Sequence, residues 1–467
     1  MELKNKRVLV VGLGRSGVAA ATFLQEQGAR VIVSDTKTEA QLQNEISLLL
    51  DRGISIETGR HGERTFRDQD LIVVSPGVPS DQPQLQQARS LGIPVIGEVE
   101  LACRYLKGRI IAITGSNGKT TTTTLAGEIL AKSGKKTLVG GNIGTPVISL
   151  AGQSSADGFD VLEISSFQLE TIQQFKPNIA VVLNITPDHL DRHRTFQAYV
   201  EAKARIFENQ QPADFGLLNA DDPTCVGLKS KVKGALYWFS RKQRVESGAS
   251  VAHDANDNAQ IIFRANGQET PVLSLSDIQL KGTHNLENVL AAVCIGMIAG
   301  CPPQQVRKAV MEFQGVEHRL ELAATIHGVA FYNDSKATNV DATIKALESF
   351  PGNIHLILGG KDKGSDYTVL NSLLRERAKR AYLIGAAAEK IGAQIQGSTP
   401  IVYSGTLERA VRQAFDAAAS GDVVLLAPAC ASFDQFENYE HRGRAFKELV
   451  GALAAKSNQP VTLGGRG

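Results

Sequence analysis

A glycine turn followed by a lysine and a run of hydroxyl side chains is the stretch of the chain best suited to phosphate chemistry. The turn follows an apolar run and consists of Gly115, Ser116, Asn117, Gly118, Lys119, Thr120 and Thr121. Backbone N–H groups of such a turn can point at phosphate oxygens, and the end of the following helix adds positive potential. We expect Lys119 to reach the β- and γ-phosphates of a nucleotide, and the Thr120 hydroxyl to bind Mg²⁺.

This turn departs from the standard G-x-x-x-x-G-K-[ST] pattern, because Ile113 stands at the position of the first glycine. An ordinary connection between a strand and a helix is therefore an alternative interpretation. The strand pattern over 109–113, the helical spacing over 125–130 and the unbroken threonine run 120–124 favour the phosphate site.

A second glycine turn, G-x-G-x-x-G at residues 12–17, follows the apolar run 8–11, and Asp35 ends the next apolar run. This pattern predicts a β-α-β unit that binds a nucleotide diphosphate. Taken alone, it fits a dinucleotide-binding dehydrogenase equally well, and a purely structural turn is a third interpretation. Another apolar run leads into the loop that holds Ser75 and Gly77, a position where open α/β sheets bind ligands.

An acid and a histidine follow two further apolar runs, Glu163 after one and His189 after the other. Beside a phosphate loop, this pair suggests metal and phosphate chemistry, whereas a surface position is the favoured interpretation for His193. Zinc is disfavoured, because no third nitrogen or sulfur ligand lies at typical spacing. Lys203 lies in a helical pattern over 196–210, where a solvated side chain is as compatible with the spacing as a functional one.

The second half of the chain begins with a β-rich stretch over 230–281, in which Asn266-Gly267 predicts a hairpin. Asn285 and Asn288 then share one face of a predicted helix, where they could read a base edge or cap the helix. Three later apolar runs each lead into a polar loop, which predicts an open parallel sheet with a binding edge. These loops cover residues 333–339, 359–364 and 428–436.

Length and composition limit the classes of protein to consider. At roughly 100 to 200 residues per domain, the 467 residues suggest three domains. With 50 Lys and Arg against 48 Asp and Glu, no overall charge favours binding to nucleic acid or a membrane. The five cysteines include no C-x-x-C pair, which fits a reducing compartment. No apolar stretch approaches the roughly 18 residues of a membrane span, so we expect a cytoplasmic protein.

The predicted fold class is α/β with three domains. We expect an N-terminal Rossmann-like domain over 1–97, a central P-loop ATPase-like domain with a small β-rich part over 98–315, and a C-terminal Rossmann-like domain over 316–467.

With these clusters in place, the chain resembles the Mur ligases of bacterial peptidoglycan synthesis, ATP-dependent amide-forming enzymes related to folylpolyglutamate synthase. The resemblance covers essentially the whole chain. It is carried by 114–121, Glu163, 188–191, 283–285, His318, Arg319 and Asp334, and more specifically by 163–170, 333–339 and 432–443. The specific segments resemble the family member that adds D-glutamate to UDP-N-acetylmuramoyl-L-alanine.

The resemblance implies that ATP phosphorylates the alanyl carboxylate and that the amine of D-glutamate attacks the resulting acyl phosphate. The implied catalytic residues are Lys119, Glu163, His189, Lys203 and Lys336. Thr120 and Glu163 would bind one Mg²⁺, and His189 and Lys203 a second. Lys203 aligns with a lysine that the family carries as a carbamate, which would turn a cation into an oxygen ligand.

The resemblance implies that the domain over 1–97 binds the UDP-linked substrate, and that the domain over 316–467 binds the amino acid and rotates to close over ATP. It also implies three groups of binding residues. ATP would be held by the phosphate loop from Gly115 to Thr121 together with Asn285, Asn288, Arg319 and Asp334. The UDP substrate would be held by Arg15, Ser16, Asp35, Thr36, Lys37, Ser75, Gly77 and Asn142. D-Glutamate would be received by Thr338, Lys363, Ser432, Phe433 and Tyr439. Lys361 competes with Lys363 for this role, and Phe433 stands where a smaller aliphatic residue is expected.

Three classes of function were compared against these residues. A dehydrogenase explains only residues 8–35, and a nucleotide-binding regulator has no use for the polar loops 333–339 and 432–436. Within the ligases, another Mur ligase or a folylpolyglutamate synthase is the nearest alternative, and the segment 432–436 decides against it. We therefore predict the D-glutamate ligase, acting as a monomer on small-molecule substrates.

Overall fold

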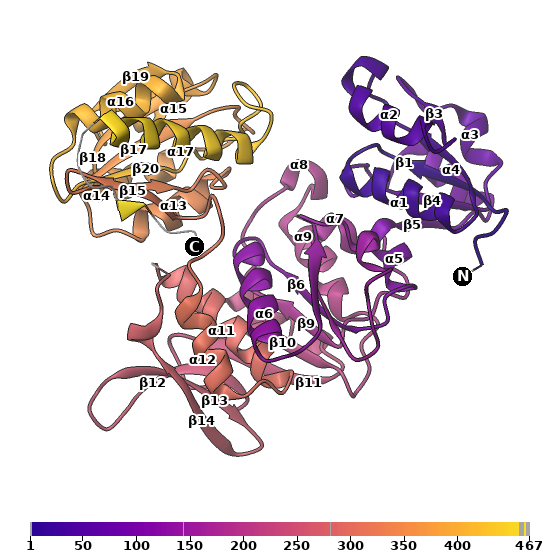
Figure 1. Cartoon of the computed structure of the whole chain (residues 1–467), viewed down its shortest axis with the longest axis horizontal. Coiled ribbons are helices and arrows are strands. Elements are labelled where there is room, and N and C mark those ends of the chain that lie inside the picture. Colours follow the sequence, from indigo (N-terminus) through magenta and orange to yellow (C-terminus); the bar gives the residue numbers. More distant parts are fainter. Residues whose placement is uncertain (1, 143, 281, 457–461, 464–467) are drawn as a thin grey trace. The chain divides into compact units, whose positions relative to one another are not determined.

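The computed structural model describes residues 2–142, 144–280, 282–456 and 462–463. They form a mixed α/β fold with three sheets (Figure 1). The chain divides into two compact units: the first holds Met1–Ile278 and Glu287–Glu312, and the second holds Gln279–Leu286 and Phe313–Gly467. The predicted α/β class with three sheet-based parts is confirmed. The boundaries at 97/98 and 315/316 stay a prediction, because the first unit contains two of the sheets.

The first sheet is parallel, with the strand order β3-β2-β1-β4-β5. Its strands are β1 (Arg7–Val11), β2 (Arg30–Ser34), β3 (Ser55–Glu57), β4 (Leu71–Val74) and β5 (Val95–Gly97). The helical segments around it are α1 (Arg15–Glu26), η1 (Glu39–Gln41), α2 (Gln43–Leu50), α3 (Glu63–Arg67) and α4 (Pro83–Ser90). Strand β1 pairs with β2 on one side and with β4 on the other, so the strand order reverses beside β1. The glycine turn follows β1 and the Ser75 loop follows β4, and ligands bind at such a reversal in open α/β sheets.

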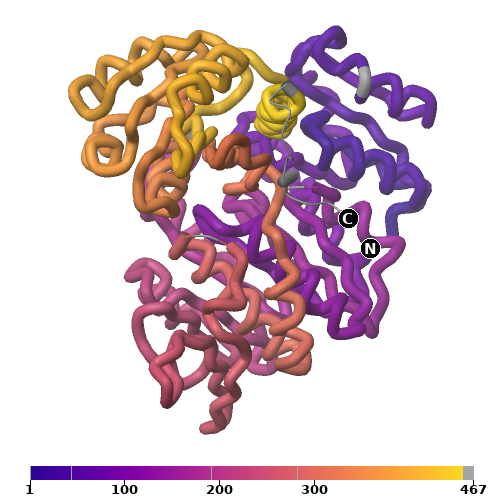
Figure 2. The backbone as a smooth tube through the Cα atoms, turned by 60° about the vertical axis from the view of Figure 1, so that its left-hand side comes forward, coloured from indigo at the N-terminus to yellow at the C-terminus, as the bar shows by residue number. Residues whose placement is uncertain are grey.

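The second sheet has the order β14-β13-β12-β11-β10-β9-β6-β8-β7. Its strands are β6 (Arg109–Thr114), β7 (Thr137–Gly141), β8 (Phe159–Glu163), β9 (Ile179–Val182), β10 (Phe215–Asn219), β11 (Ala235–Ser240), β12 (Gly248–His253), β13 (Ala259–Ala265) and β14 (Gln268–Ser274). The strands from β6 to β12 run parallel to one another, whereas β13 runs antiparallel to both of its neighbours, β12 and β14. The strands β12, β13 and β14 are drawn in rose in Figure 2. The predicted hairpin is confirmed: Asn266 and Gly267 join β13 to β14 with φ of 52° and 73°.

The helical segments of this part complete the first unit. They are α5 (Glu98–Cys103), α6 (Lys119–Lys132), η2 (Val147–Leu150), α7 (Ser166–Leu169), α8 (Leu190–His193), α9 (Phe196–Ala204), η3 (Arg205–Phe207), α10 (Pro223–Gly227), η4 (Lys229–Lys231), η5 (Leu275–Asp277), α11 (Thr283–Ile298) and α12 (Pro303–Glu312). The helix predicted over 196–210 is shorter, because the chain tightens into a 3₁₀ turn at Arg205, whose guanidinium binds the carbonyls of Leu169 and Glu170.

The third sheet lies in the second unit, with the order β19-β18-β17-β20-β16-β15-β21. Its strands are β15 (Glu321–Ile326), β16 (Val329–Asn333), β17 (Ile354–Gly359), β18 (Ala378–Ile384), β19 (Ile401–Gly405), β20 (Val423–Leu426) and β21 (Thr462–Leu463). Its helical segments are α13 (Val340–Glu348), η6 (Thr368–Leu370), α14 (Asn371–Arg377), α15 (Ala388–Ile395), α16 (Leu407–Ala417) and α17 (Tyr439–Lys456). The sheet is mixed, because β15 runs antiparallel to its neighbours.

The three strands that were expected to carry polar loops are direct neighbours in this sheet. β20 lies between β16 and β17, and all three run parallel. Their carboxyl ends, and therefore the three polar loops, meet at one edge, as the sequence predicts. Across the described residues, no helix has both the length and the apolar character to cross a bilayer.

Candidate active site

The phosphate turn connects β6 to α6 through two glycines with positive φ, Gly115 at 158° and Gly118 at 84°. A Cβ on Gly118 would lie 2.1 Å from Oδ1 of Asn288, so the position accepts only glycine without movement. The Lys119 ammonium donates to the carbonyl oxygens of Gly115 (2.8 Å) and Ser116 (3.0 Å). The turn, the helix start and the lysine therefore occupy the arrangement expected of a phosphate cradle.

Two residues outside the turn hold it in shape, and the sequence did not indicate either role. The side-chain amide of Asn184 accepts a hydrogen bond from the Asn117 N–H (2.8 Å) and donates to the Asn117 carbonyl (3.1 Å). The hydroxyl of Tyr199, which is buried, lies 3.1 Å from the Ser116 hydroxyl. Tyr199 belongs to the apolar stripe of α9. The spacing of that stripe predicts a buried ring, but it does not predict that the hydroxyl of the ring contacts the phosphate turn.

Lys203 is buried in the same place, with 1% of its surface exposed. Its ammonium donates to the Gly115 carbonyl over 2.8 Å and lies 3.4 Å from the Thr114 hydroxyl. Burial lowers the pKa of this lysine well below its ordinary value, and the nearby charge of Lys119 lowers it further. The alternative of a solvated helical lysine is therefore wrong.

Glu163 ends β8 and is buried, with its Oε1 3.2 Å from the Asn142 side-chain amide. Its charge also acts on Lys203, whose pKa it raises against the larger effect of burial. The structure thus brings Glu163 to the Lys203 side of the phosphate turn. A buried carboxylate and the Thr120 hydroxyl are oxygen donors of the kind that Mg²⁺ prefers, so the chemistry of the donor set fits this cation.

The two histidines at the end of the neighbouring strand differ from expectation in one respect. His189 is about half exposed and adopts a left-handed backbone with φ of 53°. His193, for which a surface position was expected, is buried: it stacks on Phe167, and its Nε2 lies 3.0 Å from the Ser166 hydroxyl. The expectation was wrong because the spacing of α8 does not show that Phe167, from a distant segment, covers this ring.

At the first sheet, Asp35 connects the glycine turn to the end of β2. Its two carboxylate oxygens accept from the N–H of Leu13 (2.6 Å) and the N–H of Lys37 (2.8 Å). The Ser75 hydroxyl donates to the Gly12 carbonyl over 2.8 Å. Asp35 and Ser75 therefore hold the glycine turn in place. The other residues predicted here to bind the UDP substrate are more accessible; these are Arg15, Ser16, Thr36, Lys37 and Gly77.

The predicted adenine and phosphate residues are divided between the two units. In the first unit, Asn288 Oδ1 accepts from the Thr122 hydroxyl over 3.4 Å. In the second unit, Asp334 is buried and accepts from the Leu320 N–H. Burial raises the pKa of Asp334 to about 7, and the charge of Arg319 opposes that rise. Asn285 is buried and also groups with the second unit.

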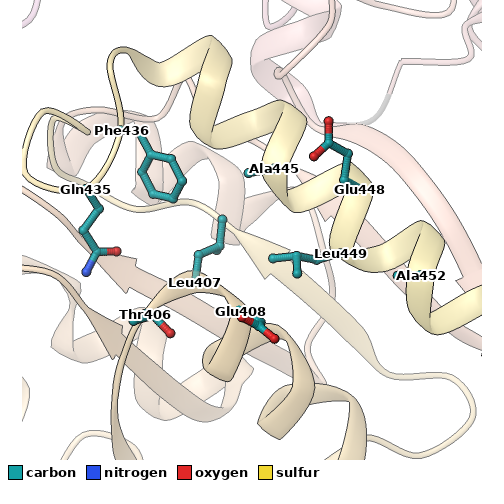
Figure 3. Close-up of a pocket in the computed structure, with 9 residues that line it drawn as sticks. All are labelled: Thr406, Leu407, Glu408, Gln435, Phe436, Ala445, Glu448, Leu449 and Ala452. Atoms are coloured by element: carbon teal, nitrogen blue, oxygen red, sulfur yellow. The ribbon is translucent and has the colours of Figure 1, made fainter.

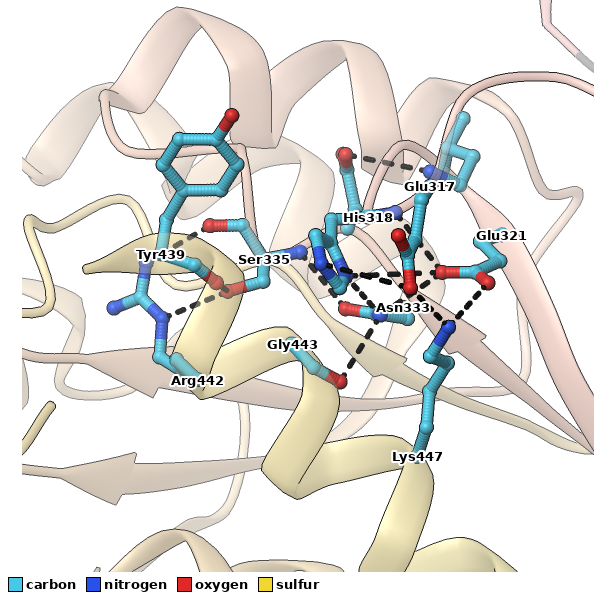
Figure 4. A network of polar contacts seen from close by, with 11 residues as sticks. Glu317, His318, Glu321, Asn333, Ser335, Tyr439, Arg442, Gly443 and Lys447 are labelled. Carbon is cyan, nitrogen blue, oxygen red and sulfur yellow. Dashed lines mark hydrogen bonds and ion pairs between the residues drawn. The ribbon is translucent and has the colours of Figure 1, made fainter. Parts of the chain in front are cut away.

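Of the residues predicted to bind D-glutamate, Tyr439 lies at the start of α17, where its carbonyl accepts from the hydroxyl of Ser335 in the loop after β16 (Figure 4). The Lys336 ammonium lies 3.3 Å from the Tyr439 hydroxyl and 5.0 Å from the centre of its ring. Ser432 is buried, whereas Phe433 is 67% exposed. Thr338 is half-buried, and Lys361 and Lys363 are both exposed.

Arg442 is a buried residue of this region that the sequence did not indicate. Its guanidinium donates to the Ser335 hydroxyl (3.0 Å), the Ser335 carbonyl (2.9 Å) and the Cys430 carbonyl (3.1 Å) (Figure 4). Burial lowers its pKa to about 10, and the charge of the nearby Asp434 only partly opposes this shift. Arg442 thus joins the loop after β16 to the loop after β20. Its place within the segment 432–443 was the only available signal.

Glu317, His318 and Glu321 bring three possible ligand atoms together in the second unit. The Lys447 ammonium donates to both carboxylates, over 2.6 Å to Glu317 and 2.9 Å to Glu321 (Figure 4). The Asn333 amide occupies His318 Nδ1 at 2.9 Å. These contacts define an ion-pair network rather than a metal centre.

A groove of about 640 Å³ lies elsewhere in the second unit, between α16 and α17 (Figure 3). Leu407, Phe436 and Leu449 form its apolar walls, and Glu408 and Glu448 lie at its rim. None of the predicted site residues lines this groove.

Together, the fold and the site define an α/β enzyme with a phosphate-type turn between β6 and α6 of its second sheet. Three family profiles match the chain: the MurD-like N-terminal domain of Mur ligases over 6–97, the Mur ligase middle domain over 113–296, and the Mur ligase glutamate ligase domain over 318–430.

Two curated relatives extend the match to nearly the whole chain. Both are called UDP-N-acetylmuramoylalanine--D-glutamate ligase. The protein from Koribacter versatilis is 64% identical over 98% of this chain and 100% of its own length, and the protein from Acidobacterium capsulatum is 58% identical over 96% and 97%. The chain therefore belongs to the Mur ligase family, and within it to the UDP-N-acetylmuramoylalanine--D-glutamate ligases.

Solved structures of Mur ligases share the fold. The crystal structure of UDP-N-acetylmuramate-alanine ligase MurC from Thermotoga maritima matches with a TM-score of 0.61 and 20% identity over 96% of this chain and 100% of that one. The crystal structure of MurF ligase from Thermotoga maritima in complex with ADP matches with a TM-score of 0.61 and 17% identity over 97% of both chains.

Proposed function

We propose that this chain is the ATP-dependent ligase that adds D-glutamate to UDP-N-acetylmuramoyl-L-alanine, in the cytoplasm and on the route to peptidoglycan. The high identity to relatives called by that activity supports the reaction and its amino acid. The single structural observation that carries the chemistry is the convergence of Lys119 and Lys203 on the Gly115 carbonyl, on the Glu163 side of a phosphate turn. ATP as the energy source is supported further by the related MurF ligase crystallised with ADP.

The chemistry requires a carboxylate to be activated, because it does not react with an amine at neutral pH. Transfer of the γ-phosphoryl group of ATP to the alanyl carboxylate yields an acyl phosphate. The amine of D-glutamate then attacks, and phosphate leaves. Negative charge collects in both steps, so positioned cations and backbone dipoles lower the barrier. Lys119 and the N–H groups of the turn stabilise the β- and γ-phosphates.

Thr120 and Glu163 are the proposed ligands of one Mg²⁺, and His189 with Lys203 the ligands of a second. Bound there, Mg²⁺ neutralises the phosphate oxygens. An ammonium cannot bind a cation, but burial lowers the pKa of Lys203 and so favours the neutral amine, the form that adds CO₂ with release of a proton. The lysine carbamate so formed is an oxygen ligand. The low pKa of Lys203 is what favours this modification.

The remaining predicted residues divide the substrates between them. The UDP moiety is proposed to lie over Asp35 and Ser75, with Asn142 at the muramoyl group. Asn285, Asn288, Arg319 and Asp334 are assigned to the nucleoside and phosphates of ATP. D-Glutamate is assigned to the edge of the third sheet with Lys336, and we propose a monomer as the active form.

The function is tested by measuring phosphate release from ATP in the presence of UDP-N-acetylmuramoyl-L-alanine, with D-glutamate, L-glutamate, L-lysine or meso-diaminopimelate as the acceptor. We expect release with D-glutamate only. Release with another acceptor would retain the ligase chemistry but refute the assigned amino acid. No release with any acceptor would refute the ligase and leave a nucleotide-binding regulator.

Lys361 and Lys363 are distinguished by single alanine variants in the same assay. A charge-assisted hydrogen bond to the side-chain carboxylate is about twice as strong as a neutral one, so we expect Lys363→Ala to raise the KM for D-glutamate about 100-fold. Lys361→Ala serves as the matched control, and a larger rise in that variant would move the contact to Lys361.

A further inference from the structure

Tyr367 connects two of the polar loops at the edge of the third sheet. Its side chain is fully buried, and its hydroxyl donates to Asp362 Oδ1 over 2.7 Å and lies 3.0 Å from Cys430 Sγ. Asp362 belongs to the loop after β17, and Cys430 to the loop after β20. One hydroxyl group thus contacts both loops below the proposed D-glutamate site.

The same two loops are also paired through their backbones. The Lys361 N–H donates to the Ala431 carbonyl over 2.8 Å, and the Ala431 N–H donates to the Lys361 carbonyl over 3.1 Å. Lys363 lies two residues beyond this pair in one loop, and Ser432 lies one residue beyond it in the other. The contacts of Asp362 and Cys430 with Tyr367 therefore lie directly beside the backbone pair that joins the two loops.

Tyr367 and Asp362 are themselves fixed to α15. The Tyr367 N–H donates to Gln394 Oε1 over 2.8 Å, and the Lys390 ammonium donates to Asp362 Oδ2 over 2.7 Å. Burial alone would raise the pKa of Asp362, but the hydrogen bonds from Lys390 and Tyr367 lower it to about 2. Asp362 is therefore ionised at any working pH, and its charge is matched by Lys390 instead of Lys363.

We propose that Tyr367 is a positioning residue for the amino-acid substrate: through Asp362 and Cys430 it sets the separation between Lys363 and Ser432. Because Lys390 matches the charge of Asp362, the Lys363 ammonium can meet a dicarboxylic amino acid. This inference rests on the proposed function, and it adds a residue that makes no contact with the substrate.

The test is Tyr367→Phe, which removes the hydroxyl and keeps the buried ring. We expect the KM for D-glutamate to rise about tenfold, because a hydrogen bond to a charged group is lost. The KM values for ATP and for UDP-N-acetylmuramoyl-L-alanine are expected to stay within about twofold, since their assigned residues lie outside these two loops. Asp362→Asn, which keeps the shape of the side chain, should raise the same KM without removing the ring.

Tyr382→Phe is the matched control. Tyr382 is another fully buried tyrosine of this sheet, with its hydroxyl 3.1 Å from His355 Nδ1 in the amino-terminal part of β17. It should change thermal stability but not the KM for D-glutamate. An unchanged KM in Tyr367→Phe, or an equal rise in both variants, would overturn the positioning role. If the wild-type enzyme releases no phosphate with D-glutamate, the proposed function fails instead, and that outcome is read from the wild type alone.

Discussion

The ammonium groups of Lys119 and Lys203 donate to the same acceptor, the carbonyl oxygen of Gly115, each over 2.8 Å. Burial lowers the pKa of Lys203 well below its ordinary value, and the nearby charge of Lys119 lowers it further. We therefore propose different roles for the two lysines: Lys119 holds phosphate, and Lys203 is the amine that can be modified. This division leads to the first prediction.

Lys203→Met should remove the amine and keep the buried apolar stem. We expect phosphate release to fall by about 100-fold or more, because one ligand of a charge-neutralising cation is lost. With ¹³C-labelled bicarbonate, the wild-type protein should show a carbamate signal that is absent from the Lys203→Met variant. An identical signal in both proteins would place the modified amine elsewhere.

Gly118→Ala should weaken ATP binding about tenfold or more, because a non-glycine residue in the left-handed region costs energy and the new Cβ would also meet Asn288 at 2.1 Å. The measurement is the ATP dissociation constant by calorimetry. Gly134→Ala is the control, since Gly134 has a similar φ of 78° with no atom within 4 Å of the added Cβ. It should lower stability by about 1 kcal/mol and leave ATP binding unchanged; equal weakening in both variants would show that strain alone is responsible.

Glu98 should make the first unit less stable as the pH rises from about 4.5 to 7. Burial raises its pKa from 4.5 to about 7, and Oε2 has no hydrogen-bond partner among the described residues. The folded state therefore binds more protons than the unfolded state within this window, so unfolding becomes easier as the pH increases, and the full cost persists above pH 7.

The matching variant is Glu98→Gln, which should be more stable than the wild type by up to about 3 kcal/mol at pH 8 and nearly equal to it at pH 4. Urea unfolding at both pH values measures the difference. Glu100→Gln is the control on the same helix, because Glu100 accepts from three backbone N–H groups and from Arg104. That variant should lose stability at pH 8. A Glu98→Gln effect that does not change with pH would refute the assigned titration.

Arg442→Met should destabilise the second unit by about 2 to 4 kcal/mol, because buried carbonyls and a hydroxyl lose their donor. Lys447→Met, on the same helix, removes an ion pair that is partly solvated, and should cost no more than about 1 kcal/mol. Denaturant unfolding of the two variants gives the comparison. A smaller loss in Arg442→Met than in Lys447→Met would contradict the role of Arg442 in joining the two loops.

Much of the fold could be predicted, because strand periodicity and glycine spacing are local. The runs before Gly115, Glu163 and Asn333 are strands, and parallel order then brings their polar ends to shared edges. The hairpin at Asn266 was equally visible, because its turn needs two residues with positive φ.

The contacts that complete the site could not be predicted, because they join residues far apart in the chain. Asn184 holds Asn117 across 67 positions, and Arg442 holds Ser335 across 107. The burial of His193 was missed for the same reason, since Phe167 covers it from a different segment. No local pattern reveals which polar side chain of a helix meets a loop from elsewhere. The domain boundaries and the roles of the individual site residues remain predictions.

Helix α11 is shared between the two units: its first residues, from Thr283 to Leu286, group with the second unit, and the rest, from Glu287, groups with the first. The first unit ends only at Glu312. A chain that emerges from the ribosome in order must therefore synthesise part of the second unit before the first is complete. The phosphate-loop helix α6 packs against α12, and Lys132 of α6 pairs with Glu312. Until α12 has been translated, nascent α6 has an uncovered face. This face stays open to chaperones while the 180 residues between the end of α6 at Lys132 and the end of α12 at Glu312 are synthesised.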